Sequence, residues 1–311
     1  MEQGQSSTTV AGVDVGKYRL DAATATASLV TGNDAAGIAA LLGWLASHGV
    51  GRVGMEATGG YERALRLALE AEGIEVVVHQ PLEVKLYGRL NRRHAKTDAG
   101  DARLIAAATA AIGRPAKRTD PALAELGERL TVYEHVADQV MRLKTFRDGL
   151  ILADMAALIE LEIDRLKALK ALLARQLIQA VRTSAGLRAR YDLLVSLPGI
   201  GPIVATSLIV RMPELGDMQR GQAASLIGVA PHARESGQWK GQRFIAGGRA
   251  RPRRMLYLAA LAARGRDKTL KAFADALVAR GKPPKLAIVA IMRKLIEAAN
   301  IVLKRQTPWT T

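Results

Sequence analysis

The chain has 311 residues, 49% of them apolar and 24% charged, with 45 Lys and Arg against 29 Asp and Glu and a formal net charge of +16. This length allows two or three domains with a sizeable core, and the composition excludes a disordered or fibrous chain. A surplus of this size, with a pI near 10.4, is typical of proteins that bind a polyanion, and nucleic acid is the first partner to consider.

Several classes of protein are excluded at once. The chain has no Cys, which excludes disulfide frameworks, thiolate metal sites and thiol nucleophiles, and its five His show no metal-site spacing. The start, MEQGQSSTTV, lacks the basic and then apolar pattern of a signal peptide. The apolar stretch from Leu286 to Leu303 contains Arg293, Lys294 and Glu297, which argues against a membrane span. We therefore expect a cytoplasmic protein.

The positive charge is concentrated in the C-terminal part. Residues 186–311 carry 22 Lys and Arg against 7 Asp and Glu, whereas residues 1–185 carry 23 against 22. The densest stretch contains one acid, Glu235, and the cations Arg234, Lys240, Arg243, Arg249, Arg251, Arg253 and Arg254. Charge runs are often only solvated surface. Arg mixed with Gly favours phosphate contact, because the guanidinium binds phosphate through two N–H groups and Gly lets the backbone approach.

The first region alternates strand-like and helix-like patterns. Short β-branched or apolar runs predict strands at Thr9 to Val15, Leu20 to Leu29, Arg52 to Glu56 and Glu75 to His79. Helical spacing occurs at Ala35 to Ala46, at Tyr61 to Ala71 and at Asp98 to Ala111, the last with Thr97 or Asp98 as its cap. The region is therefore expected to be an α/β domain.

A long helical segment follows, from about Pro121 to Val181, with almost no Gly or Pro. Apolar residues recur in steps of three and four along it, which predicts long paired helices. Gly149 interrupts the pattern, so a helical hairpin or two packed segments is as good an interpretation as one rod. With no chemistry visible, the expected role of this segment is spacing or self-association.

The last region is expected to be mainly helical. Helical composition is found at Leu187 to Leu197, Ile203 to Met212, Ala223 to Val229, Arg254 to Ala263 and Lys285 to Lys304. A polar loop rich in Gly and Arg lies between the third and fourth of these, from Pro231 to Pro252.

Four carboxylates stand out by their context. Asp14 lies inside an apolar strand, where a charge costs stability unless it is paired or binds a metal, and Glu56 ends a strand in the same manner. Asp98 and Asp101 are three residues apart and share one helical face. Together the four would form an all-oxygen site suited to Mg²⁺, and two such metals can hold the attacking and leaving oxygens of a phosphodiester displacement.

Each acid also has an ordinary structural interpretation. Asp14 could pair with Lys17 or Arg19, Glu56 could cap the helix that opens near Gly60, and the Asp98 pair could simply begin a charged helix. The stretch from Asp14 to Gly16 alone also matches actin-like sugar kinases, whose turn cradles a phosphate. Taken jointly, strand-end acids followed by a helix-borne pair favour the ribonuclease H-like arrangement of metal ligands.

Two further features concern phosphate chemistry. The link Leu197-Pro198-Gly199-Ile200-Gly201 between helical segments is typical of a helix-hairpin-helix, whose N–H groups bind phosphate, although a plain helix–helix turn is the alternative. Of the four serines after residue 186, Ser196 adjoins this hairpin, and Ser207 and Ser225 fall in apolar helical runs that indicate packed positions. Ser236 lies in the polar, Arg-rich loop, where it is either a turn residue or a nucleophile activated by its surroundings.

These motifs together resemble the DEDD transposases of bacterial insertion sequences, the family numbered 110. The resemblance covers nearly the whole chain in order, through AGVDVGK, GMEATGGYE, KTDAGDA, LPGIG and GVAPHARESGQWKGQRFIAGGRARPRRMLY. The GGR-containing tail is similar to the branch numbered 1111. Many relatives carry a second serine before the Gly of the Glu-Ser-Gly match, whereas this chain has Glu235 there, so Ser236 is the only candidate in the motif.

The resemblance implies three parts and a set of site residues. The parts are a RuvC-like, ribonuclease H-like α/β domain over 1–118, a coiled-coil spacer over 119–185, and a mainly α-helical transposase domain with a helix-hairpin-helix over 186–311. The implied metal ligands, also catalytic, are Asp14, Glu56, Asp98 and Asp101, and the implied nucleophile is Ser236. The nucleic-acid contacts that we expect are Lys17, Gly199, Gly201, Arg234, Lys240, Arg243, Arg249, Arg251, Arg253 and Arg254.

The implied reaction is DNA transposition through a covalent phosphoserine. It would use two Mg²⁺ ions, with Mn²⁺ as the alternative, on donor and target DNA directed by an element-encoded noncoding guide RNA. We expect a homo-oligomer, a dimer or a tetramer, that acts beside the bacterial nucleoid, with a site assembled from two domains. The alternatives are a RuvC-like junction endonuclease using metal-activated water, in which Ser236 is incidental, and a noncatalytic nucleic-acid-binding protein.

Overall fold

The computed structural model describes residues 9–91, 98–115, 120–232, 235–236, 239–240 and 244–310. These residues form two compact units, Met1–Asp120 and Pro121–Thr311. The long helical segment belongs to the second unit, together with the C-terminal helices. The three-part division at residues 118 and 185 stays a prediction.

The first unit is built on a five-stranded sheet in the order β3-β2-β1-β4-β5. Strand β2 is antiparallel to both of its neighbours, β1 and β3, and β4 and β5 continue the sheet parallel to β1. The strands are β1 Thr9–Val15, β2 Arg19–Ala23, β3 Ser28–Gly32, β4 Val50–Glu56 and β5 Glu75–His79. This mixed α/β sheet is consistent with a ribonuclease H-like fold.

The apolar run predicted from Leu20 to Leu29 is two strands rather than one. A tight turn divides it at Thr24, whose N–H donates to the Ala27 carbonyl at 2.9 Å and whose hydroxyl accepts from the Ala27 N–H at 3.0 Å. A Thr side chain can satisfy turn N–H groups in this way, and the alternation of Ala and Thr does not reveal it.

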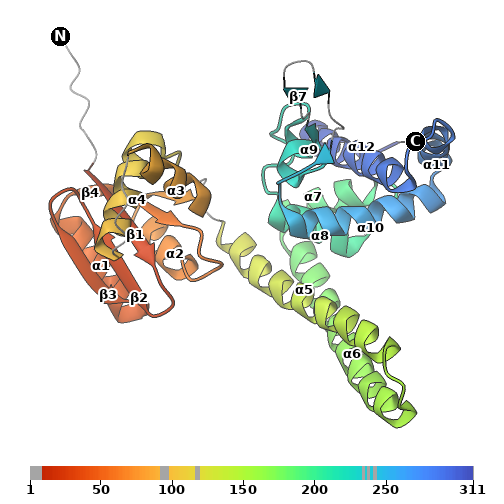
Figure 1. Cartoon of the computed structure of the whole chain (residues 1–311), viewed down its shortest axis with the longest axis horizontal. Helices are drawn as coiled ribbons and strands as arrows, with labels where there is room; N and C mark the ends of the chain where they lie inside the picture. The colour runs from red at the N-terminus through yellow and green to blue at the C-terminus, as the bar shows by residue number, and fades with distance from the viewer. Residues whose placement is uncertain are drawn as a thin grey trace. The chain divides into compact units, whose positions relative to one another are not determined.

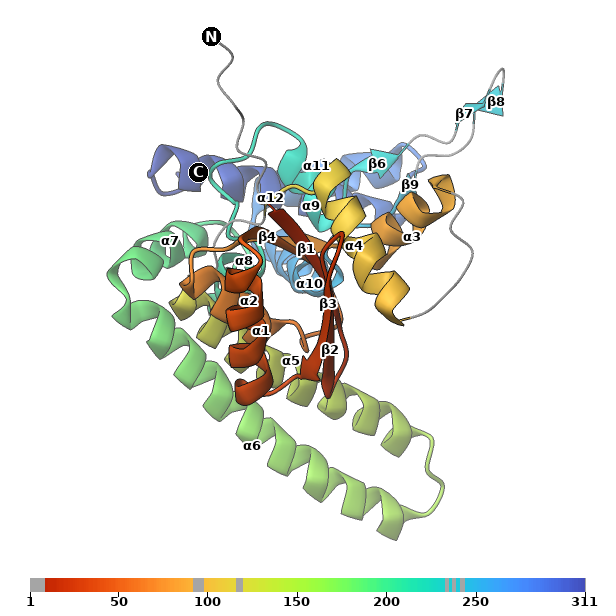
Figure 2. The ribbon, with the colours of Figure 1, turned by 90° about the vertical axis from the view of Figure 1, so that its left-hand side faces the viewer.

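Helices cover both faces of the sheet (Figure 2). α1 (Ala35–Ser47) and α2 (Arg63–Ala71) pack on one face, where their leucines form one core with alternate residues of β1 and β4. α4 (Asp98–Ile112) packs on the other face, across β1, β2 and β4. α3 (Pro81–Leu90), which the sequence patterns did not predict, begins with Pro at its first position and packs against α4.

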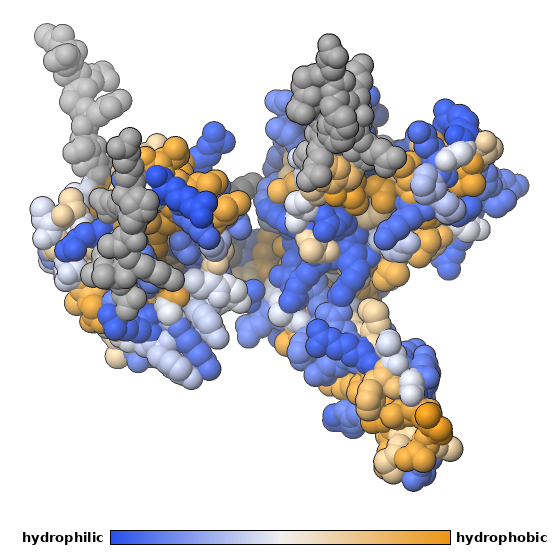
Figure 3. Space-filling model, viewed as in Figure 1, coloured by the Kyte–Doolittle hydropathy of each residue, from blue (hydrophilic) through white to orange (hydrophobic). Residues whose placement is uncertain are grey.

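The second unit begins with a helical hairpin (Figure 1). α5 (Pro121–Asp148) and α6 (Ala153–Thr183) are joined by a short loop and pack together through a small apolar cluster: Val136, Val140, Ile163 and Leu166. The hairpin predicted as one alternative is therefore present. At its tip the surface is apolar (Figure 3), with Ile151, Leu152, Leu158 and Leu161 exposed.

The rest of the second unit is a mainly helical domain around one large core. Its helices are α7 Ala185–Val195, α8 Pro202–Arg211, α9 Gln222–Ile227, α10 Ala250–Arg266, α11 Lys268–Ala279 and α12 Pro284–Arg305. α11 was not predicted, and α10 starts within the predicted polar loop. The described part of that loop contains paired short strands: β6 Pro231–His232 with β9 Phe244–Ile245, and β7 Glu235–Ser236 with β8 Trp239–Lys240. Among the helices that the structure describes, none combines the length and apolar character needed to span a membrane.

Candidate functional site

Two adjacent parallel strands bring Asp14 and Glu56 to the same edge of the sheet. In the register of β1 and β4, Gly12 is opposite Gly54 and Val13 is opposite Met55, so the next residues along the two strands are the two acids. Side chains alternate along a strand, and Val13 and Met55 are buried with α1 and α2. Asp14 and Glu56 therefore share the face of Gly12 and Gly54, which α4 covers.

Two glycines let α4 lie directly on this face. A Cβ atom placed on Gly12 would be 2.2 Å from the Ala102 carbonyl oxygen and 2.3 Å from the Ala106 nitrogen, and one on Gly54 would meet the Thr109 side chain. α4 thus approaches both strands more closely than a side chain at either glycine would allow, with its backbone at Gly12 and with the Thr109 side chain at Gly54. Asp101 directly precedes the point of contact with Gly12, which places it beside the end of β1.

An electrostatic interaction links three of the four predicted acids, Asp14, Glu56 and Asp101. Burial raises the pKa of the Glu56 carboxyl above its ordinary value of 4.5, and the nearby carboxylates of Asp14 and Asp101 raise it further. The side chain of Asp98 lies outside the described residues, although its backbone begins α4. Among the side chains that are described, no three acids or histidines lie close enough to enclose a cation.

A fifth acid lies on the same face. Asp21 of β2 is opposite Asp14 in the antiparallel register and is buried. Its carboxylate accepts a hydrogen bond from the Arg19 guanidinium at 2.5 Å, so its charge is compensated within its own strand. The sequence analysis considered Arg19 only as a partner for Asp14 and gave no role to Asp21.

Two loops form the rim above the acids, and Asn33 holds them together. Its side-chain amide donates to the Gly16 carbonyl at 2.8 Å and to the Tyr61 carbonyl at 3.1 Å, and its backbone N–H donates to the Tyr18 carbonyl at 3.1 Å. Tyr18 and Tyr61 are exposed, and the Lys17 ammonium lies 4.9 Å from the centre of the Tyr18 ring. The rim therefore presents aromatic faces and a cation.

Glu62 fixes the second of these loops. Its carboxylate accepts hydrogen bonds at 2.8 Å from the Thr58 hydroxyl and from the Gly60 N–H. Although burial acts to raise it, the pKa of Glu62 is lowered by these hydrogen bonds and by one from the Thr58 N–H. The loop before α2 is thus held by the carboxylate of Glu62 and not by that of Glu56.

A buried histidine supports α4 from the neighbouring strand. His79 of β5 is paired with Glu56 in the sheet register, and its Nε2 lies 2.9 Å from the Thr109 hydroxyl. That hydroxyl donates to the Ile105 carbonyl at 2.7 Å, so it accepts from His79, which fixes the Nε2–H tautomer. Burial lowers the pKa of His79 below 6.5. The only indication of this role for His79 in the sequence is that a polar residue ends the apolar run of β5.

The predicted nucleophile belongs to the second unit. Ser236 is on β7, where it pairs with Trp239 of β8, and its side chain lies outside the described residues, as does that of Lys240. Arg234 and Arg243 also lie outside them. Of the two serines expected at packed helical positions, Ser207 of α8 is buried as expected, whereas Ser225 of α9 is exposed, contrary to expectation.

The arginines at the start of α10 make ion pairs within their own unit. Arg249 donates to both oxygens of Glu214 at 2.6 and 2.8 Å, Arg251 pairs with Glu134, and Arg254 pairs with Asp138 at 2.7 Å. Arg253 donates instead to backbone carbonyls, including that of Gly247. Their contact with nucleic acid stays a prediction, and these pairs give them a structural role as well.

Glu134 is the centre of this network. Its side chain is 1% exposed, and one oxygen accepts from both Arg211 of α8, at 2.9 Å, and Arg251 of α10. Its other oxygen has no hydrogen-bond partner among the described residues. One buried carboxylate of α5 thus ties the hairpin to two helices of the C-terminal domain.

Gly199 and Gly201, the two glycines of the predicted helix-hairpin-helix, have different surroundings. Gly199 has a positive φ of 79°, and a Cβ there would be 2.3 Å from the Ala259 carbonyl, so α10 packs against this turn. Gly201 begins α8, and a Cβ on it would meet nothing within 4 Å. The helix start at Gly201 is therefore open to a ligand, while Gly199 is required by packing.

Comparisons with known proteins identify the family. Residues 11–151 match a model of DEDD transposases of the IS110 type, described as a transposase, and residues 191–275 match the model of the transposase IS116/IS110/IS902 family. The chain is also similar to the pilin gene-inverting proteins of Moraxella lacunata and Moraxella bovis, each 26% identical over 317 residues that cover 97% of this chain and 98% of the relative. The chain therefore belongs to the IS110-type transposases and recombinases, which act on DNA.

Proposed function

We propose that this chain is a metal-dependent DNA recombinase of an insertion sequence, in which Asp14, Glu56, Asp98 and Asp101 hold divalent cations and Ser236 is the nucleophile. The observation that carries the proposal is the register that places Asp14 and Glu56 at the same end of adjacent strands, together with a raised pKa of Glu56, caused first by burial and then by the carboxylates of Asp14 and Asp101. We further infer that it belongs to the branch numbered 1111 and acts in the bacterial cytoplasm, beside the nucleoid.

The donor set suits Mg²⁺, or Mn²⁺ as the alternative. All four groups are carboxylates, the ligands that hard divalent cations prefer, and their mutual repulsion is relieved by cation binding. The close contact of α4 with Gly12 keeps Asp101 next to the end of β1, which supports a role for Asp101 in the proposed site. When bound, two such ions would polarise the scissile phosphate and lower the cost of deprotonating the nucleophile.

In the proposed reaction the Ser236 oxygen attacks the phosphorus of the scissile phosphodiester. The bond from phosphorus to the 3′ oxygen breaks, the DNA strand leaves with a 3′-hydroxyl that takes up a proton, and a phosphoserine diester joins the protein to the 5′ side. Attack by a 3′-hydroxyl of another strand reverses the step and reseals the DNA. The covalent link conserves the energy of the phosphodiester, so strand exchange needs no ATP.

Residues around the two centres would hold the nucleic acids. Lys17, with Tyr18 and Tyr61, is suited to position the strand above the acids, because ammonium groups pair with phosphate and tyrosine rings stack on bases. The open start of α8 at Gly201 suits phosphate as a helix-hairpin-helix does. Donor and target DNA are the proposed substrates, and the proposed noncoding guide RNA rests on the family resemblance alone.

A homo-oligomer is the proposed state of the protein. The tip of the α5 and α6 hairpin exposes a patch of Ile151, Leu152, Leu158 and Leu161. An exposed apolar patch on a rigid hairpin is a self-association surface in the ordinary case. We propose that the α5 and α6 hairpin joins the subunits of a dimer or tetramer as a coiled coil. We further propose that the four acids and Ser236 are assembled into one site in this oligomer.

The test is to trap a covalent intermediate. The substrates are duplexes carrying the ends of the encoding element, with Mg²⁺ and RNA transcribed from the DNA beside the gene. We expect a detergent-resistant protein–DNA adduct whose phosphoserine maps to Ser236, lost in Ser236→Ala and kept in the control Ser225→Ala, also a serine of the second unit. Asp101→Asn should abolish adduct and cleavage, while the exposed control Glu72→Gln should retain both.

Two outcomes contradict the proposal. Metal-dependent cleavage that persists in Ser236→Ala, with no adduct in either protein, indicates attack by water, as in a junction endonuclease. Full activity of Asp101→Asn shows that the acids are structural, as the noncatalytic interpretation requires.

A further inference from the structure

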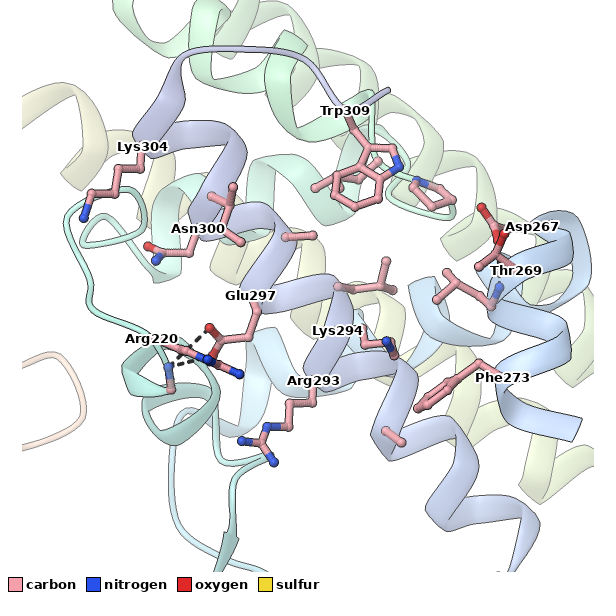
Figure 4. Close-up of a pocket in the computed structure, with 18 of the residues that line it drawn as sticks. Arg220, Asp267, Thr269, Phe273, Arg293, Lys294, Glu297, Asn300, Lys304 and Trp309 are labelled. Atoms are coloured by element: carbon pink, nitrogen blue, oxygen red, sulfur yellow. Dashed lines mark hydrogen bonds between the residues drawn. The ribbon is translucent and has the colours of Figure 1, made fainter. Parts of the chain in front are cut away.

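The C-terminal domain contains a large groove whose lining residues lie outside the serine loop. It lies along α12 and has a volume of about 1200 Å³. Its other walls are the turn at Leu197 and Pro198, the segment before α9, the start of α11 and the tail after α12 (Figure 4). None of the residues that line the groove was among the predicted nucleic-acid contacts, although Leu197 and Pro198 directly precede one of them, Gly199.

The tail that closes one end of the groove is held in place. α12 ends at Arg305, and the next residue, Gln306, has a positive φ of 51° that turns the chain back. The Trp309 backbone N–H then donates to the Ser196 hydroxyl at 2.8 Å, and this hydroxyl donates to the Leu193 carbonyl at 2.7 Å. Trp309, 40% exposed, is thereby fixed at the groove.

The groove is electropositive. Four cations line it: Arg220, Arg293, Lys294 and Lys304. The two lining acids already serve backbone donors, because Glu297 accepts from the Gly221 N–H at 3.2 Å and Asp267 accepts from the Leu270 N–H at 2.7 Å. No ion pair joins any of the four cations to a carboxylate among the described residues.

Two of the cations, Arg220 and Arg293, lie on the opposite side of α12 from the aromatic rings, whereas Lys294 lies on the side of the rings. Figure 4 shows Arg220 and Arg293 beside Glu297 on one side, and Phe273 and Trp309 on the other. The Lys294 ammonium lies over the Phe273 ring, 4.4 Å from its centre. A single nucleic-acid strand has the same two-sided character, with phosphates along one edge and unpaired base faces along the other.

We propose that this groove binds a single-stranded segment of DNA, with its phosphates on Arg220, Arg293 and Lys304 and a base stacked on Trp309. A duplex hides its base faces and would leave the aromatic side unused. DNA is the occupant because the family acts on DNA, and a strand cut for exchange must be unpaired. The inference rests on that family assignment and is independent of the proposed metal ligands and of Ser236.

The experiment measures binding of the full chain to a fluorescent oligo(dT) strand in EDTA, so that no catalysis contributes. The double variant Arg293→Glu with Lys304→Glu is compared with Lys282→Glu with Lys285→Glu, which changes the net charge equally on exposed residues outside the groove. We expect only the groove pair to flatten the plot of log K against log salt, by about 1.4, since each phosphate contact on a single strand contributes about 0.7.

Trp309 gives a second and independent measurement. Trp309→Ala should weaken single-strand binding by about fivefold or more, whereas Trp309→Phe should retain most of it, because a ring can still stack. Addition of the strand should quench tryptophan fluorescence in the wild type more than in Trp309→Phe, which keeps Trp44 and Trp239. Circular dichroism would establish that each variant is folded.

Three results would overturn the inference. The first is equal salt slopes for the groove pair and the control pair. The second is a loss of duplex binding as large as that of single-strand binding, with no effect of Trp309→Ala. The third is dependence on the groove for oligo(U) but not for oligo(dT), which would assign it to RNA. Loss of adduct formation in Asp101→Asn, with unchanged oligo(dT) binding, would separate the catalytic proposal from this one.

Discussion

The contact between α4 and Gly12 makes a prediction that links the fold to the site. Replacing Gly12 by Ala adds one carbon 2.2 Å from the Ala102 carbonyl oxygen and 2.3 Å from the Ala106 nitrogen. Both neighbours are helix backbone, so no side chain can rotate away to make room. The helix itself has to withdraw from β1, and Asp101 moves with it.

The size of the effect follows from these distances. Ordinary van der Waals contact begins at 3.4 Å, so α4 must withdraw by about 1 Å. Overpacking of this kind costs about 1–3 kcal/mol of folding free energy. A misplacement of about 1 Å at a catalytic centre lowers the rate about 100-fold. Gly12→Ala should therefore remain folded but lose about 99% of the wild-type activity.

Urea denaturation and adduct formation with Mg²⁺ would measure the two effects. The matched control is Gly43→Ala in α1, where the added carbon meets nothing within 4 Å. Because Ala is favoured over Gly inside a helix, this control should gain about 0.4–1 kcal/mol and keep full activity. Wild-type stability and activity in Gly12→Ala would refute the close approach of α4 and, with it, the positioning of Asp101.

Three further predictions concern charged groups. The pKa of Glu56 is raised in the folded chain, so the contribution of Glu56 to stability is present below about pH 4.5 and is lost as the pH rises through the pKa of the folded state. In thermal melts with a chelator, Glu56→Gln should remove this loss of stability with rising pH. In melts with Mg²⁺, the same variant should be stabilised less than the wild type. The pKa of Glu62 is lowered in the folded chain, so Glu62 contributes stability at neutral pH and loses this contribution as the pH falls. Glu62→Gln should therefore cost stability at neutral pH and little in acid. Identical profiles of stability against pH for Glu56→Gln and Glu62→Gln would contradict both assignments. Glu134→Ala removes a buried carboxylate from Arg211, which is 19% exposed, and from the exposed Arg251, so it should lower the unfolding free energy by about 3 kcal/mol, the low end for a broken buried pair. The exposed pair broken by Glu125→Ala should cost less than about 1 kcal/mol, and equal losses in urea melts would show that the network is not buried in solution.

Much of the first unit could be predicted because its sequence patterns are local. The strands at Thr9–Val15 and Glu75–His79 have the predicted bounds, and α4 begins at Asp98 as expected. The turn at Thr24 could not be predicted, because it depends on one hydroxyl replacing a backbone partner. α11 was missed for a related reason: it starts directly after α10, with the side chain of Asp267 as its cap and no Pro between them.

The acids could be predicted individually, but their support could not. Asp14 and Glu56 are conspicuous because each is a charge in an apolar strand. The residues that position them are ordinary in the sequence: Gly12 and Gly54 under α4, Asn33 between two loops, and His79 against Thr109. Their roles exist only between segments that the fold brings together, so no local pattern contains them.

The density of charge along the chain is a poor guide to where positive potential reaches the surface. The arginines at 249, 251 and 254 lie in the most basic stretch, yet each meets a carboxylate of another segment: Glu214, Glu134 and Asp138. Those acids are far away in sequence, so the pairs cannot be seen in composition. The groove along α12 is the reverse case, because its cations at 220, 293 and 304 are scattered in the sequence but converge in space, and the acids nearest to them serve backbone N–H groups. A surplus of charge therefore predicts that nucleic acid binds, while the folded pairing of charges decides where.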